Sequence, residues 1–126
     1  MCASNNLSNL PNLPNSLEML DCFDNSLSSL PTLPNSLNFV DCDRNSLYSL
    51  PELPNSLTEF ICSHNKISKI PELPNSLKCL YCEYNNLSSL PDLPNSKINI
   101  RYANNPIHIH IKNFFDGKTK KYFEHQ

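Results

Sequence analysis

The sequence has a single glycine, no long apolar run and few basic residues before residue 97. One glycine cannot build a glycine-rich loop that cradles phosphate. No stretch is apolar over the roughly 18 residues that a membrane-spanning helix needs. We also find no arrangement of nucleophile, base and orienting residue. These absences argue against an enzyme, and we expect no catalytic residues and no cofactor.

The two ends of the sequence lack targeting signals. The first residues, MCASNNLSNL, have neither the basic nor the apolar segment of a secretory signal. Cys2 stands where myristoylation requires glycine, and the final EHQ does not match a prenylation motif. We therefore expect an intracellular, cytoplasmic protein.

Charge is distributed unevenly along the chain. Residues 1–96 carry four Lys and Arg against ten Asp and Glu, whereas residues 97–126 carry six against two. The first part is thus at −6 and the second at +4, which sums to the net charge of −2. Because phosphate binding relies on basic surface, the acidic part argues against nucleic acid as a partner, and we expect no membrane partner either.

A period of twenty residues organises the chain. The segment LEMLDCFDNSLSSLPTLPNS at 17–36 recurs with the same fixed positions three more times. Self-similarity at such a period is the signature of a solenoid. The predicted units are a partial one at 1–16, full ones at 17–36, 37–56, 57–76 and 77–96, and a degraded one at 97–107.

The consensus is L-x-x-L-x-C-x-x-N-x-L-x-x-L-P-x-L-P-N-S. Its first eleven positions fit the leucine-rich-repeat pattern. The whole unit resembles the short repeats of secreted bacterial effectors of the YopM and IpaH type. The resemblance implies an α/β-class leucine-rich-repeat solenoid, here essentially β, with a curved parallel sheet on the concave side and an extended, polyproline II convex side. It also implies an effector-like role of bacterial or viral origin and a place in the host cytoplasm. Only about twenty residues follow the repeats, so the catalytic domain of IpaH-type effectors is not carried over.

Each unit should place a strand near the equivalent of 19–23. Period-two alternation sends Leu20 and Cys22 inward and leaves Met19, Asp21 and Phe23 on the outer, concave face. Aromatic groups among carboxylates are typical of protein interfaces. We expect this face to bind a protein or peptide that carries basic groups. The predicted partner-binding residues are Met19, Asp21, Phe23, Phe39, Asp41, Asp43, Glu59, Ile61, Tyr81, Glu83 and Arg101.

Two other columns are predicted to be structural. Stacked asparagine amides can satisfy backbone groups where each coil turns. Free cysteines on the inner face should behave as small, reduced apolar groups, although strand spacing alone leaves disulfides open. The asparagine ladder comprises Asn25, Asn45, Asn65, Asn85 and Asn105. The cysteine ladder comprises Cys22, Cys42, Cys62 and Cys82, with Cys2 in phase.

We predict no metal site. Cys79 and Cys82 form a CxxC, but residues three apart on a strand face opposite ways. His108 and His110 share one face of a predicted terminal strand, a geometry that can chelate a metal if His125 returns through the hairpin. We favour the alternative, an alternating edge strand with a polar outer face. The Asp-Gly at 116–117 predicts a hairpin, so 108–126 should be a capping strand and hairpin. The alternative to a binding module is a structural protein that stacks head to tail through an uncapped first unit, giving a monomer or a weak oligomer.

Overall fold

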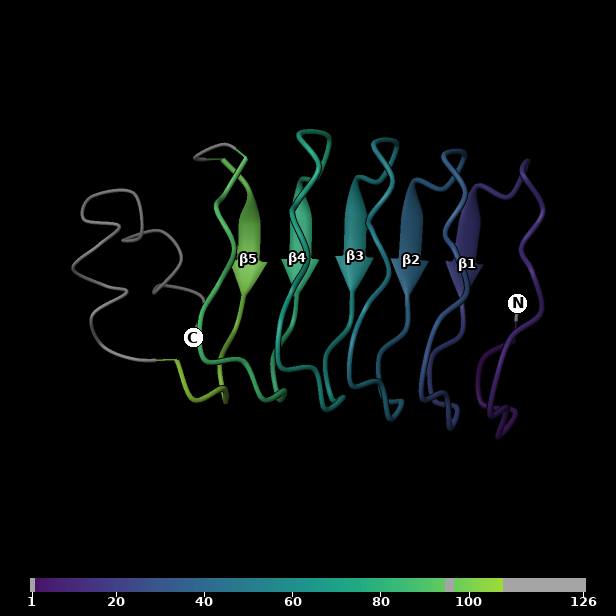
Figure 1. Cartoon of the computed structure of the whole chain (residues 1–126), viewed down its shortest axis with the longest axis horizontal. Coiled ribbons are helices and arrows are strands. Elements are labelled where there is room, and N and C mark those ends of the chain that lie inside the picture. The colour runs from purple at the N-terminus through teal and green to yellow at the C-terminus, as the bar shows by residue number, and fades with distance from the viewer. Residues whose placement is uncertain (1, 95–96, 108–126) are drawn as a thin grey trace.

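The computed structural model of the chain describes residues 2–94 and 97–107. In this part the chain winds into successive coils, and each coil adds one strand to a parallel sheet with the order β1-β2-β3-β4-β5 (Figure 1). The strands are β1 (Met19–Asp21), β2 (Phe39–Asp41), β3 (Glu59–Ile61), β4 (Cys79–Tyr81) and β5 (Asn99–Arg101).

Neighbouring strands pair without any slip. Met19 lies beside Phe39, and Phe39 lies beside Glu59. The twenty-residue period of the sequence therefore becomes a set of straight columns across the sheet, one column for each repeat position.

The strands are two residues shorter than the sequence predicts. Backbone pairing does continue past β1, since the Cys22 amide donates to the Asp41 carbonyl at 2.9 Å. Asp24, however, has a φ of 58°, in the left-handed region. This reversal turns the chain away from the sheet three residues after β1 ends.

The core is filled by one side chain per coil at each inward position. Leu20, Val40, Phe60, Leu80 and Ile100 occupy the central inward column and are buried. The cysteine column and the leucines at 27, 47 and 87, with Ile67 between them, continue this core. A single coil cannot bury such a stripe alone, so stacking is what stabilises the fold.

The returning arms on the convex side are extended, and no helix occurs in residues 2–94 and 97–107. No segment there forms a helix long and apolar enough to cross a membrane. Leu33, Leu53 and Leu73 point inward from these arms. Ser36 and Ser76 each donate a hydroxyl hydrogen bond to the preceding coil, to the carbonyls of Leu17 and Leu57 at 2.6 Å. The Asn-Ser turns thus join neighbouring coils as well as closing their own.

This architecture confirms the predicted solenoid with a parallel sheet and an extended convex side. The domain boundaries stay a prediction. The proposed cap at 108–126 lies outside the described residues.

Candidate functional site

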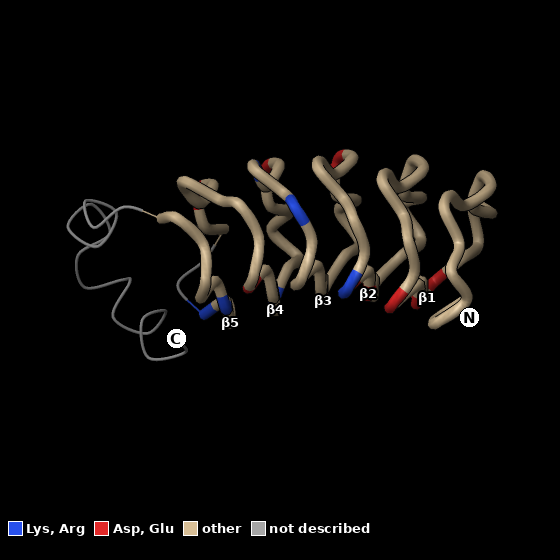
Figure 2. The backbone as a smooth tube through the Cα atoms, turned by 90° about the horizontal axis from the view of Figure 1, so that it is seen from below, with Lys and Arg blue, Asp and Glu red and all other residues tan. Residues whose placement is uncertain are grey.

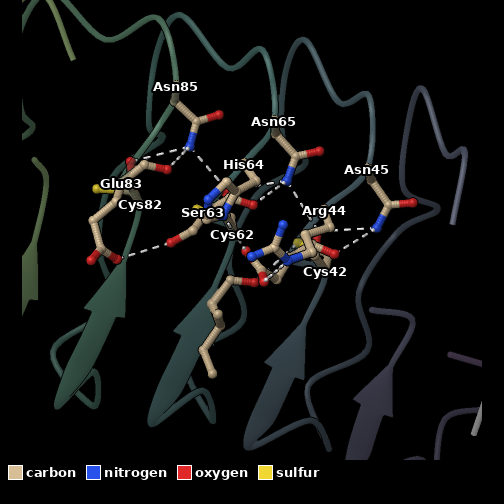
Figure 3. Close-up of polar contacts among 12 residues, drawn as sticks. Cys42, Arg44, Asn45, Cys62, Ser63, His64, Asn65, Cys82, Glu83 and Asn85 are labelled. Atoms are coloured by element: carbon tan, nitrogen blue, oxygen red, sulfur yellow. Dashed lines mark hydrogen bonds and ion pairs between the residues drawn. The ribbon is translucent and has the colours of Figure 1, made fainter. Parts of the chain in front are cut away.

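The asparagine ladder runs along the edge where the strands end (Figure 3). Asn65 donates from Nδ2 to the carbonyls of Cys42 at 3.0 Å and of Cys62 and Ser63 at 3.1 Å. Its Oδ1 accepts from the Leu47 amide at 2.9 Å. Each amide therefore ties its own coil to the preceding one. The same bonds recur at Asn25, Asn45, Asn85 and Asn105.

The residue before each ladder asparagine is left-handed. These residues are Asp24, Arg44, His64, Tyr84 and Asn104, with φ between 55° and 62°. For a residue with a Cβ this conformation costs about 1–2 kcal/mol. No sequence pattern indicates this conformation, because glycine, the residue that would mark such a turn, is absent from all five positions.

The cysteine ladder is buried in the core. Cys22, Cys42, Cys62 and Cys82 are inaccessible to solvent, and all six cysteines are free thiols. Burial raises the pKa of Cys22 and of Cys82 to about 12. Burial, reinforced by neighbouring thiols, also raises the pKa of Cys42 and Cys62 well above the ordinary value. Such thiols stay protonated and unreactive at neutral pH.

The amino-terminal half of the concave face is a grid of apolar and acidic side chains. The strand register places Met19, Phe39 and Glu59 in one column. It places Asp21, Asp41 and Ile61 in the column beside it.

The apolar members of this grid remain accessible. Met19 is 56% exposed. Phe39 and Ile61 are each partly exposed, in contrast to the buried Val40 and Phe60 that alternate with them along β2 and β3. The grid therefore offers apolar surface beside charge.

The three carboxylates of the grid have no ion-pair partner among the described residues. Asp21 and Asp41 use one oxygen each to accept from the backbone amide two positions on, at 3.3 and 3.0 Å. Burial, together with Asp21 and Asp43, raises the pKa of Asp41. Glu59 is exposed, and no cation among the described residues pairs with its carboxylate. The grid is therefore an uncompensated negative region.

Beyond the carboxyl ends of the strands, the acidic side chain of Asp43 has partners within the molecule. Asp43 lies 3.3 Å from Nδ1 of His64 and 3.6 Å from Nε of Arg44. The His64 ring stacks on Tyr84 with 4.5 Å between the ring centres. Asp43, one of the predicted partner-binding residues, thus has Arg44 as an ion-pair partner and His64 as a polar contact within the molecule.

Phe23 and Glu83, two of the predicted partner-binding residues, also lie beyond the ends of the strands. Phe23 is partly exposed. Ser63, whose position belongs to the concave face, is only 5% exposed and donates its hydroxyl to Oε1 of Glu83 at 3.0 Å. Glu83 is thus engaged by a neighbour on one of its two oxygens.

The carboxyl-terminal half of the face has a different character. Arg101 places its guanidinium carbon 4.4 Å from the ring centre of Tyr81. Asn99 donates from Nδ2 to the Tyr81 hydroxyl at 3.4 Å, and its Oδ1 is buried without a hydrogen-bond partner. The stacking depends on side-chain rotamers in two different coils, so sequence reasoning did not find it.

No metal centre emerges from the described residues, where no group of three or more His, Cys, Asp or Glu side chains could hold an ion. Cys79 is partly exposed on the concave face, whereas Cys82 is buried on the inner side. The two thiols of the CxxC therefore diverge. His108, His110 and His125 lie outside the described residues.

An open groove of about 790 Å³ lies between the returning arms, on the side away from the sheet. Pro51, Glu52, Leu53 and Glu72 are among the residues that line it. These positions belong to the repeated structural arm, and we attach no site to the groove.

Comparison with known proteins gives consistent relatives. The family described as Leucine Rich repeats (2 copies) matches residues 55–95. YopM from Yersinia enterocolitica is 36% identical with a TM-score of 0.76, over 79% of this chain and 22% of that one. YopM from Yersinia pestis is 40% identical with a TM-score of 0.76, over 82% and 31%.

A Shigella effector LRR domain is 30% identical with a TM-score of 0.75, over 94% of this chain and 65% of that one. No curated protein matches by sequence. The chain thus spans between about a fifth and two thirds of the length of these solved structures.

Proposed function

Because this chain is a leucine-rich-repeat protein with short repeats like those of YopM and the Shigella effector domain, we propose that it is a non-enzymatic interaction module. It binds a protein or peptide across its concave face. The proposed function needs no cofactor, and its place is inside a cell, in the host cytoplasm for an effector.

One observation carries this proposal: the grid combines accessible apolar groups with unpaired carboxylates. Met19 and Phe39 supply apolar surface, and Asp21, Asp41 and Glu59 supply uncompensated charge. Neither the apolar nor the acidic side chains of the grid are needed for folding, because the inward columns and the ladders stabilise the solenoid. A large side chain ringed by polar groups is typical of an interface anchor.

The charge of the grid indicates the chemistry of the partner. Asp21 and Asp41 lie on neighbouring strands at the same level, where like charges repel. Burial is the main cause of the raised pKa of Asp41, and the carboxylate of Asp21 raises it further. A lysine or arginine of the partner would relieve the repulsion and speed the encounter.

The experiment compares capture by three immobilised proteins. The wild type is set beside a Phe39→Ala, Asp41→Ala variant and a control with Tyr48→Ala and Glu52→Ala. The control also removes one aromatic and one acid, but Tyr48 is 58% exposed and lies outside the strands, and Glu52 is exposed on the convex arm.

Proteins bound from a cell lysate are identified by mass spectrometry, and folding is checked by circular dichroism. We expect a partner that the wild type and the control retain and the grid variant loses. Equal capture by a folded grid variant would show that the partner binds elsewhere.

A second candidate function, self-association, is favoured by the first described coil. Leu7, Leu13 and Leu17 pack against the core but remain partly exposed, unlike their buried counterparts Leu47, Leu53 and Leu57. Stacking of a second copy on this end would cover them. Light scattering over a range of concentrations tests this, and a constant monomeric mass would exclude it.

A further inference from the structure

The concave face changes sign along its length. Acidic positions lie on the strand side of the solenoid near β1, and basic positions lie near β5 (Figure 2). At the level of the strands, the acids are Asp21, Asp41 and Glu59, and the base is Arg101. The face is therefore a dipole that runs across the strands.

Arg101 is held in place yet keeps its hydrogen-bonding groups. Its guanidinium lies over the Tyr81 ring at 4.4 Å, and the Tyr81 hydroxyl is itself held by Asn99. A guanidinium that stacks on an aromatic ring keeps its N–H donors at the edge of its plane. Arg101 is exposed and has no carboxylate within ion-pair distance among the described residues. It is thus a preorganised donor for which the described residues supply no carboxylate acceptor.

The single cation favours a carboxylate as that acceptor. One planar guanidinium matches one carboxylate through two parallel hydrogen bonds. A phosphate group carries close to two negative charges at neutral pH. It would leave part of its charge unpaired at this single cation, so it is the poorer match.

The strand spacing sets the distance between the two charged ends. Asp41 on β2 and Arg101 on β5 are three strands apart, which corresponds to about 14 Å. An extended peptide advances about 3.3 Å per residue, so about four residues separate the groups that reach these positions.

From these observations we propose that the concave face binds an extended peptide segment that crosses the strands and carries a basic side chain and a carboxylate about four residues apart. The basic group lies over Asp21, Asp41 and Glu59, and the carboxylate binds Arg101. This inference rests on the proposed function and adds the charge pattern and orientation of the partner.

The test is a selection from a phage library of random linear dodecapeptides. It is run in parallel on the wild type, Arg101→Glu, Asp41→Lys and Lys69→Glu. Lys69→Glu is the matched control for Arg101→Glu, because it also replaces a positive charge with a negative one, at an exposed position outside the strands. Arg101 is exposed as well, so neither Arg101→Glu nor Lys69→Glu disturbs the core.

We expect wild type and Lys69→Glu to enrich peptides with Lys or Arg about four positions from Asp or Glu. Peptides selected on Arg101→Glu should still be enriched in basic residues but no longer in acidic ones. Peptides selected on Asp41→Lys should still be enriched in acidic residues but no longer in basic ones. A synthetic peptide from the wild-type pool is then measured by fluorescence anisotropy. Amidation of its acidic side chain should weaken binding to the wild type roughly tenfold, as loss of a charge-assisted pair predicts, and should leave binding to Arg101→Gln unchanged.

Two results would overturn the inference in distinguishable ways. A wild-type pool rich in basic residues alone, or an acidic preference that persists in Arg101→Glu, would refute the dipolar partner and leave the proposed function standing. Peptides that bind equally well to the Phe39→Ala, Asp41→Ala variant would refute both, because the grid would then not be the site.

Discussion

Removal of the central ladder amide should be among the most destabilising single changes in this chain. Asn65→Ala deletes three donor contacts, to the carbonyls of Cys42, Cys62 and Ser63, and one acceptor, for the Leu47 amide. At about 1 kcal/mol net for each hydrogen bond, the loss is about 3–4 kcal/mol. The whole domain is stable by only about 5–15 kcal/mol.

The assay is urea unfolding followed by circular dichroism. Asn55→Ala is the matched control, since Asn55 lies in an exposed turn of the neighbouring coil. We expect Asn65→Ala to lower the free energy of unfolding by about 3–4 kcal/mol and Asn55→Ala to lower it by less than about 0.5 kcal/mol.

Asn65→Asp separates the two roles of the amide. It keeps the acceptor for Leu47 and loses every donor, so it should destabilise at neutral pH and recover in part when the carboxyl is protonated. A free energy of unfolding for Asn65→Ala that matches the Asn55→Ala control would refute the reasoning that these amides stabilise the stack.

Three further predictions concern thiols, turns and pH. In native protein a maleimide should label Cys2 and Cys79 and leave the four buried ladder cysteines unlabelled until urea is added; rapid labelling of all six would contradict their burial. The pKa of these thiols is higher in the folded protein than in the unfolded chain, so as pH rises the unfolded chain loses its thiol protons at lower pH than the folded protein does. The free energy of unfolding should therefore fall as pH rises from about 9 toward 12. Arg44→Gly should stabilise by up to about 1 kcal/mol in thermal unfolding, because glycine adopts positive φ without strain, whereas Arg44→Val should destabilise. The raised pKa of Asp41 means that its ionisation lowers stability as pH rises above about 4, so Asp41→Asn, which retains an acceptor for the Asp43 amide, should be at least as stable as wild type at pH 7.

The repeat positions allowed much of the fold to be predicted. The period alone places Leu20 under Val40 and aligns Asn45 with Asn65, because parallel pairing without a slip turns equal spacing into columns. The outward direction of the Met19 and Phe39 side chains follows from the period-two alternation along a strand.

What could not be predicted depends on details that vary between coils. A left-handed residue turns the chain away from the sheet soon after each strand, as at Asp24 after β1, and no glycine marks it. The burial of Ser63 depends on the reach of Glu83 from the next coil, and the place of Arg101 depends on the aromatic ring at Tyr81. Such contacts form between positions that vary from repeat to repeat, so the repeat consensus does not predict them.

The uniform pairing of the coils also has a consequence for how such a protein evolves. Because every coil makes the same bonds to its neighbours, loss or duplication of one unit in the gene leaves the remaining columns aligned. Deletion of 57–76 would bring Asp41 and Tyr81 side by side and shorten the distance from Asp41 to Arg101 by one strand spacing, about 4.8 Å. For the proposed peptide, gain or loss of whole units would thus change the separation of its two charged groups in steps of about one and a half residues, while Asp41 and Arg101 stay in place.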